Sequence, residues 1–238
     1  MTLPFVDIFP EPYQKWHTRR PTPEEAIANR SMEAIKVSLH ATVSTPTEAA
    51  KFIGREGPDG GLKHHMERAR DASGPFKRWR RAMPSKTPEE IACYQKDYQN
   101  CNLEATSAEI DAFGKLLSEG QYLFHGGLWS SGNGMVTSRP LSTSLCPVVA
   151  FQNALWNGKA YDAGQLDLMV LRVTNPKTKA FIFRPGGTRL GHELEVLFAS
   201  GATLALKNST PVHSDFQAGK YDHPDKPIPV NVIELEIS

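Results

Sequence analysis

Residues 191–198 read GHELEVLF, a stretch in which Glu alternates with hydrophobic residues. Side chains two residues apart share one face of a β-strand, so Glu193 and Glu195 face the same way and the residues between them face the other. Six further runs of strand type occur in the second half, at 121–125, 134–142, 166–173, 179–183, 203–207 and 229–237. Gly, Pro, Asn and Asp separate these runs, as is typical of turns. Residues 120–238 are therefore predicted to be rich in β-strand.

The first half of the chain carries helix signals instead. Thr followed by Pro, with Glu three residues after the Thr, can cap a helix and close a capping box. The starts of this kind are Thr22, Thr45 and Thr87, and Thr106 is a fourth start without the proline. We expect the fourth helix to end at Gly120, a loop at 54–61, and one helix among the strands at 151–156. Helices first and strands after predict an α+β fold.

The length of 238 residues allows one domain of generous size or two small ones. No low-complexity linker separates the two halves of the chain. We therefore predict an irregular N-terminal arm at 1–20 and a single domain at 21–238. Its helical part is expected at 21–119 and its β-rich part at 120–238.

Composition excludes several classes of protein. Hydrophobic residues make up 39%, which is enough for a core, and the net charge of +1 gives no overall attraction to nucleic acid or an anionic membrane. No apolar run is long enough to span a bilayer, and no standard signal peptide is visible. We expect a cytoplasmic protein, or one delivered into a target cell's cytosol by a route without such a signal, and no membrane partner. The three cysteines have no CxxC spacing, so neither a disulfide framework nor a metal site is expected.

One segment departs from this even balance of charge. Residues 62–81 carry five more basic than acidic side chains, with Phe76 and Trp79 among them. This pattern fits a solvated helix face with aromatic anchors beneath it. It also fits a contact for nucleic acid or an acidic partner.

Three stretches in the second half carry residues suited to chemistry. Residues 122–127, YLFHGG, predict a strand that ends in His125 and two glycines, which leave the backbone open to a ligand. Residues 141–144, LSTS, predict a strand end rich in hydroxyl groups. The third is 191–198, preceded by a glycine-rich loop. Taken singly, each has an ordinary structural explanation.

Together, in this order, the three stretches resemble the ADP-ribosyltransferase superfamily, mostly its cholera-toxin-like (R-S-E) branch. Ser142, Thr143 and Ser144 match its Ser-Thr-Ser strand, and residues 193–198 match its Glu-x-Glu element with the apolar residues that follow. The resemblance covers about residues 107 to 207. One position departs, since His125 stands where that branch has Arg. A His-Gly pair there is similar to the diphtheria-toxin and poly-ADP-ribose polymerase (H-Y-E) branch, whose Tyr is not evident in this chain.

The resemblance implies a fold, a substrate and a set of roles. The fold is a helical part packed on a split, mainly antiparallel β-sheet, and the substrate is NAD. Glu195 stabilises the oxocarbenium-like transition state, Glu193 orients or deprotonates the acceptor, and Ser142 orients Glu195 or the ribose. The implied NAD-binding residues are His125, Gly126, Ser142, Thr143, Ser144, Phe151 and Arg184. Because the motif Arg is missing, the candidates to meet the pyrophosphate are Arg139, Arg184 and Arg189. The aromatic side chains that either flank the nicotinamide or pack in the core are Phe151, Trp156 and Phe183.

Three functions stay open at this point. The first is a mono-ADP-ribosyltransferase that modifies a protein arginine or a nucleic acid, as a bacterial or phage-related toxin, effector or defence enzyme. The second is an NAD glycohydrolase with water as acceptor. The third is a non-catalytic binding module on the same fold, which the His in place of the motif Arg at position 125 allows. His213 and His223, each two residues before an Asp, are interpreted as polar loop positions rather than metal ligands.

Overall fold

The computed structural model describes residues 2–129, 132–184 and 195–238. Its main sheet has eight strands. Of the seven pairs of neighbouring strands, six are antiparallel and one, β6 with β10, is parallel. In spatial order they are β4 (Gly134–Val136), β9 (Thr203–Lys220), β10 (His223–Ile237), β6 (Leu166–Val173), β3 (Tyr122–Gly127), β5 (Leu141–Ser144), β8 (Glu195–Phe198) and β7 (Ala180–Ile182). The expected α+β class and mainly antiparallel sheet are confirmed.

The sheet is nearly divided between β3 and β5. These strands pair through the single register position Phe124 opposite Ser144, whereas β3 pairs with β6 over six positions and β5 with β8 over four. The sheet therefore consists of a five-stranded and a three-stranded part with a narrow joint. This agrees with the expected split sheet.

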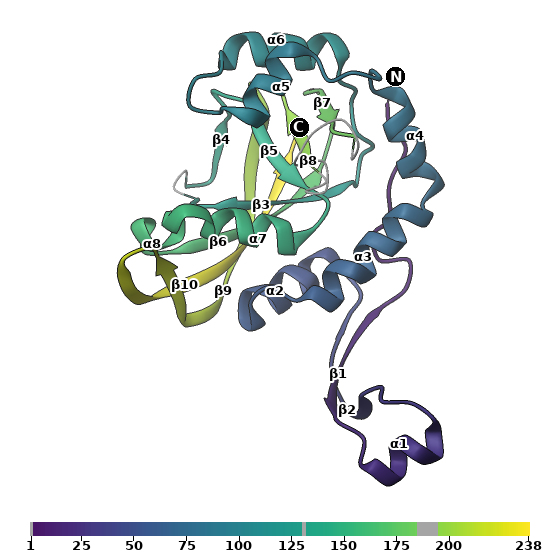
Figure 1. The fold of residues 1–238 in the computed structure, drawn as a ribbon. Coiled ribbons are helices and arrows are strands. Elements are labelled where there is room, and N and C mark those ends of the chain that lie inside the picture. Colours follow the sequence, from purple (N-terminus) through teal and green to yellow (C-terminus); the bar gives the residue numbers. More distant parts are fainter. Residues whose placement is uncertain (1, 130–131, 185–194) are drawn as a thin grey trace.

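Helices cover the sheet (Figure 1). Helices α2 (Pro46–Glu56) and α7 (Pro147–Leu155) pack on β6, and α6 (Leu103–Phe113) packs on β7 and β8. The remaining helices are α1 (Pro23–Asn29), α3 (Gly60–Ala72), α4 (Gly74–Ala82), α5 (Glu89–Lys96), the 3₁₀ turn η1 (Trp156–Gly158) and α8 (Lys159–Ala163). Among the described residues, no helix is both long and apolar enough to cross a membrane.

Two of the four predicted helix starts are confirmed. The side chain of Thr22 accepts a hydrogen bond from the backbone N–H of Glu25, and Glu25 accepts one from the Thr22 N–H, which closes the capping box of α1. Thr45 and Glu48 form the same box at the start of α2. Local sequence determines these two helix ends because the cap needs no partner from elsewhere.

The other two predicted helices are present, but they do not begin with the predicted caps. Helix α5 begins after Pro88 without a side-chain cap of its own, and the N–H groups of its residues Glu90 and Ile91 donate to the carboxylate of Glu109 in α6. Thr106 lies inside α6, which begins after Asn102 and ends at Phe113, well before Gly120. A carboxylate on a neighbouring helix thus replaces the local cap of α5, which a pattern along the chain cannot reveal.

The N-terminal arm is more ordered than expected. Residues 13–19 form β1 (Tyr13–Arg19), which pairs with β2 (Ile35–Val43) in a separate antiparallel sheet. Figure 1 shows this hairpin projecting from the rest of the chain with α1 at its tip. Most of its side chains are half-buried or exposed, so it lacks the apolar alternation that marks a strand packed on a core.

Two expected loops also differ. Gly54 lies inside α2, where a Cβ atom would come within 2.5 Å of Val212, and α3 starts at Gly60, so little of the 54–61 loop remains. His213 and His223, expected in loops, lie in β9 and β10, whose polar hairpin extends beyond the core. The runs at 203–207 and 229–237 are only parts of these two long strands, and 229–237 is the buried part of β10. The single run at 134–142 is divided into β4 and β5.

Candidate functional site

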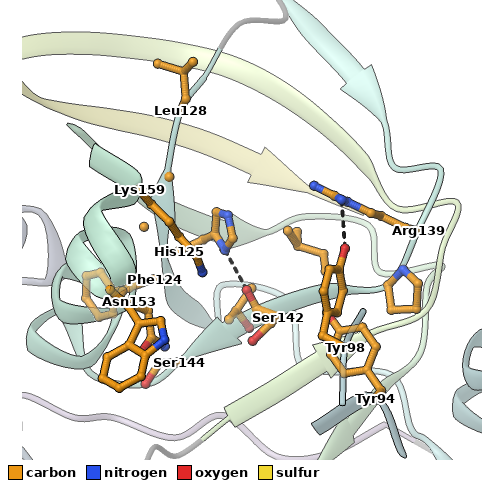
Figure 2. Close-up of a pocket in the computed structure, with 17 residues that line it drawn as sticks. Tyr94, Tyr98, Phe124, His125, Leu128, Arg139, Ser142, Ser144, Asn153 and Lys159 are labelled. Carbon is orange, nitrogen blue, oxygen red and sulfur yellow. Dashed lines mark hydrogen bonds between the residues drawn. The ribbon is translucent and has the colours of Figure 1, made fainter. Parts of the chain in front are cut away.

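A cavity of about 580 Å³ opens beside the joint between β3 and β5. Seventeen described residues line it, and they come from β3, β5, α7, the start of α8 and the helical segment around α5 (Figure 2). His125, Gly126, Ser142, Thr143 and Ser144 are among them. The structure therefore brings together five of the seven residues expected to bind NAD, from two strands that the sequence separates.

His125 is held by the neighbouring strand. Its Nδ1 lies 2.7 Å from the backbone oxygen of Ser142. A carbonyl oxygen only accepts, so Nδ1 carries the proton and Nε2 is left as an acceptor. Burial lowers the pKa of His125, the hydrogen bond to Ser142 opposes this, and the nearby Lys159 and Arg139 cations lower it further. The imidazole is therefore neutral at pH 7.

The two glycines after His125 lack a side chain for different structural reasons. A Cβ atom on Gly126 would overlap the backbone oxygen of Ala150 in α7, so β3 and α7 can lie this close only without a side chain. A Cβ on Gly127 would lie 3.3 Å from Nε2 of His125. The absence of a side chain at Gly127 leaves that nitrogen uncovered.

Ser142 and Glu195 meet across the β5–β8 pair. Ser144 lies opposite Glu195 in the register, so Ser142 is its diagonal neighbour on the same face. The Ser142 hydroxyl donates to Oε1 of Glu195 at 2.6 Å, and the side-chain amide of Gln95 in α5 donates to Oε2 at 3.1 Å. Glu195 is 8% exposed and is not one of the described residues that line the cavity. Both of its carboxylate oxygens are oriented by donors, one of which, Ser142, lines the cavity.

Thr143 and Ser144 line the cavity and also hold the backbone. The Thr143 hydroxyl donates to the backbone oxygen of Val196 at 2.7 Å and ties β5 to β8. The Ser144 hydroxyl accepts from the N–H of Cys146 at 3.0 Å, at the turn into α7. Both side chains thus fix the strand end on which Ser142 lies.

Among the described residues that line the cavity, the cations are Arg139 and Lys159. Arg139 was one of three arginines expected at the pyrophosphate, and its Nη1 donates to the hydroxyl of Tyr98 at 2.8 Å (Figure 2). Arg184 does not line this cavity, because its guanidinium donates to the backbone oxygen of Met83 instead. Arg189 and Glu193 lie outside the described residues.

Two of the expected aromatic residues belong to the core. Phe151 is fully buried and packs edge-on against Phe216, with ring centroids 5.4 Å apart, and Phe183 packs in the same way against Phe181. Neither lines the cavity, whereas Trp156 does. Trp156 is 66% exposed, which leaves its ring free for a ligand.

The helical part supplies residues that the sequence did not reveal. Tyr94 and Tyr98 line the cavity with their rings 5.1 Å apart and almost perpendicular. Burial raises the pKa of Tyr94, and the negative charge of Glu195 raises it further, so this phenol stays neutral. Tyr94 lies in α5 and Tyr98 lies in the turn just after it, so no helical spacing relates the two side chains in the sequence. Gln95 gave no signal, since its partner Glu195 lies 100 positions away.

Comparisons with known proteins gave matches only among solved structures. No family model and no curated protein matches the sequence. The enzymatic component C2-I of the C2 toxin from Clostridium botulinum matches with a TM-score of 0.41 and 11% identity. The match covers 68% of this chain and 45% of that one, so this chain spans less than half the length of that protein. Plx2a, an ADP-ribosyltransferase toxin from Paenibacillus larvae, matches with a TM-score of 0.38 and 12% identity over 81% of this chain and 96% of that one. The ADP-ribosyltransferase Vis, of Vibrio splendidus, in complex with agmatine matches with a TM-score of 0.36 and 14% identity over 81% of this chain and 82% of that one.

Proposed function

We propose that this chain is a mono-ADP-ribosyltransferase, which cleaves the bond between nicotinamide and ribose in NAD and transfers ADP-ribose to a macromolecule. The observation that carries the proposal is the 2.6 Å hydrogen bond between Ser142 and Glu195 at the wall of a cavity that His125 also lines. These three residues are the ones that the motif resemblance assigns to the site. They come from three different strands, so their convergence supports the proposal independently of their order in the sequence.

The cavity suits NAD in size and charge. Small-molecule sites typically have volumes of about 300–1,000 Å³. Arg139 and Lys159 are the cations among the described lining residues, which include no carboxylate, and a pyrophosphate needs such a positive surface. Tyr94, Tyr98 and Trp156 offer rings against which a nicotinamide can lie. The neutral His125 presents Nε2 to accept a hydrogen bond from a ribose hydroxyl.

The chemistry begins with loss of nicotinamide. The C–N bond between the ribose C1′ and the pyridinium nitrogen breaks, its electron pair goes to that nitrogen, and nicotinamide departs neutral. Positive charge develops on the ribose, as in glycoside hydrolysis. The Glu195 carboxylate stabilises this charge, and its hydrogen bonds from Ser142 and Gln95 keep it oriented before the reaction starts.

Transfer to the acceptor completes the reaction. A nucleophile of the acceptor forms a bond to C1′ and gives its proton to a base. Glu193 is proposed for this role on the motif resemblance, because it would lie on the same strand face as Glu195. Water in place of the acceptor would give free ADP-ribose.

The function is tested with NAD labelled in its adenylate part. The purified chain is incubated with the labelled NAD and a cell extract, and Glu195→Gln serves as the matched control. Label fixed to protein or nucleic acid, and absent with the control, supports the proposal. Free ADP-ribose and nicotinamide without fixed label would identify an NAD glycohydrolase. No cleavage under any condition would indicate a non-catalytic binding module.

A further inference from the structure

A second hollow, of about 270 Å³, is lined by cationic residues. Lys77, Arg80 and Arg81 come from α4, and Arg184 follows β7. None of them lines the cavity of His125. Two segments more than 100 residues apart thus bring their positive charges to one place.

These charges have no carboxylate partner in the part of the chain that the structure describes. No ion pair there involves Lys77, Arg80, Arg81 or Arg184. Like charges three and four residues apart on a helix repel each other, as Lys77 does with Arg80 and Arg81. The negative end of the helix dipole favours Arg80 and Arg81 in the last turn of α4, but it does not explain the arrival of Arg184.

Arg184 adds an unsatisfied donor. One nitrogen of its guanidinium donates to the backbone oxygen of Met83, while its Nε is buried and has no hydrogen-bond partner among the described residues. Buried donors of this kind normally have a partner, and a guanidinium is shaped to bind phosphate oxygens with two nitrogens. Four cations and an orphaned donor around one hollow indicate a phosphate site.

The hollow is close to the proposed reaction centre. The N–H of Phe183, the residue before Arg184, donates to the backbone oxygen of Glu195 at 3.2 Å. Arg184 therefore leaves the sheet beside the strand that carries the proposed catalytic carboxylate. A molecule with one group bound in the hollow would therefore lie near the strand of Glu195, and the hollow shares no lining residue with the proposed NAD cavity.

We propose that this hollow binds a backbone phosphate of a single-stranded nucleic acid, and that this nucleic acid is the acceptor of ADP-ribose. The assignment of the acceptor rests on the proposed function. Exposed cations continue beyond the hollow along α3 and α4, at Arg68 and Arg78, and neither makes an ion pair in the described ranges. These cations are more than one phosphate needs and suit a polyanion, whereas the single phosphate of a modified protein needs only the hollow. A single strand is favoured because chemistry on a base requires that base outside the stack.

Binding is tested without NAD, by fluorescence anisotropy with labelled 12-nucleotide RNA and DNA single strands over a range of salt concentrations. The variants are Arg80→Gln/Arg81→Gln and Arg184→Gln, and Arg172→Gln/Lys177→Gln is the control with an equal loss of charge at exposed positions elsewhere. Each phosphate contact to a single strand contributes about 0.7 to the slope of log K against log salt, so the Arg80/Arg81 variant should reduce the slope by about 1.4. The control should leave the slope unchanged. Because Arg80 and Arg81 are exposed, that variant is decisive even if Arg184→Gln fails to fold.

The outcomes separate this inference from the proposed function. Oligonucleotide binding that depends on Arg80 and Arg81 supports the phosphate site, whether or not NAD is cleaved. With labelled NAD added, label on the oligonucleotide supports its role as acceptor. Label on protein alone overturns that role while the proposed function stands. Equal binding by the wild type, the Arg80/Arg81 variant and the control overturns the site, as does tighter binding of a phosphoserine peptide than of either oligonucleotide.

Discussion

Replacing Glu195 by Gln removes a negative charge and keeps the shape of the side chain. The carbonyl oxygen of the new amide can still accept the hydrogen bond from the Ser142 hydroxyl, which is 2.6 Å from Oε1 in the native chain. Gln95 can turn its own amide so that its carbonyl accepts from the new NH₂ group. Both hydrogen bonds can therefore persist. We expect a stability change within about 1 kcal/mol, which for a chain of this size moves the Tm by about 2–4 °C.

The effect on catalysis should be much larger. A carboxylate about 6 Å from the developing positive charge, at an effective dielectric constant of about 20, stabilises it by about 3 kcal/mol, or about 10²-fold in rate. Removal of one preorganised electrostatic group from an active site typically costs about 10²–10³-fold. Burial of Glu195, 8% exposed, limits the screening of its charge by water. We therefore expect the rate of nicotinamide release to fall by about two to three orders of magnitude.

The assay is the initial rate of nicotinamide release from NAD, with thermal unfolding measured on the same preparations. Glu236→Gln is the matched control, because Glu236 also lies in the main sheet but pairs with Lys207 at the surface. A Glu195→Gln protein that unfolds at the native temperature and retains more than about a third of the native rate would refute the reasoning. The catalytic carboxylate would then lie elsewhere.

Three further predictions concern the parts that hold the site. The pKa of His125 is lowered in the folded chain, so below about pH 6.5 the unfolded chain binds more protons than the folded one. Both the stability and the binding of NAD should therefore fall as the pH drops below that value. His125→Gln should flatten this dependence in unfolding and binding measurements made from about pH 5 to 8. Glu109→Ala removes the acceptor for two N–H groups of α5 and should lower the free energy of unfolding, measured with denaturant, by about 1–2 kcal/mol. Activity should also fall, because α5 carries Gln95. An unchanged unfolding midpoint would contradict the capping role. Gly126→Ala places a methyl group on the backbone oxygen of α7 and should destabilise the fold by more than about 3 kcal/mol, while Gly60→Ala, which meets no atom within 4 Å, should be neutral in the same measurement.

The sequence predicted the β-rich half well because its strands are buried there. The run at 166–173 is β6 itself, since almost all its side chains lie in the core and the strand needs no polar alternation. The β1–β2 hairpin was missed because it buries little. Only parts of the long β9–β10 hairpin were predicted, and in β10 the predicted part is the buried one. Burial, rather than hydrogen bonding, therefore limits what periodicity can detect.

The site was predictable only in part, for a related reason. His125, Ser142 and Glu195 lie in strands with recognisable neighbours, so short motifs could single them out as candidates. Gln95 and Tyr94 reach the site from α5, which is fixed by a carboxylate on α6 and leaves no trace near the motifs. Hydrophobicity alone also could not distinguish an aromatic residue of the core from one of the cavity, as Phe151 and Trp156 illustrate.

His125 has a structural role at the joint of the main sheet. The two parts of the main sheet meet through the single register pair Phe124–Ser144, and His125 spans the same joint through its hydrogen bond to the Ser142 backbone. Since Ser142 in turn orients Glu195, the imidazole links the two sheet parts at the point on which the carboxylate depends. A neutral side chain does this without adding charge to the cavity. In the proposed complex with NAD, the positive charge next to the pyrophosphate would come from Arg139 and Lys159, outside the strand that carries His125.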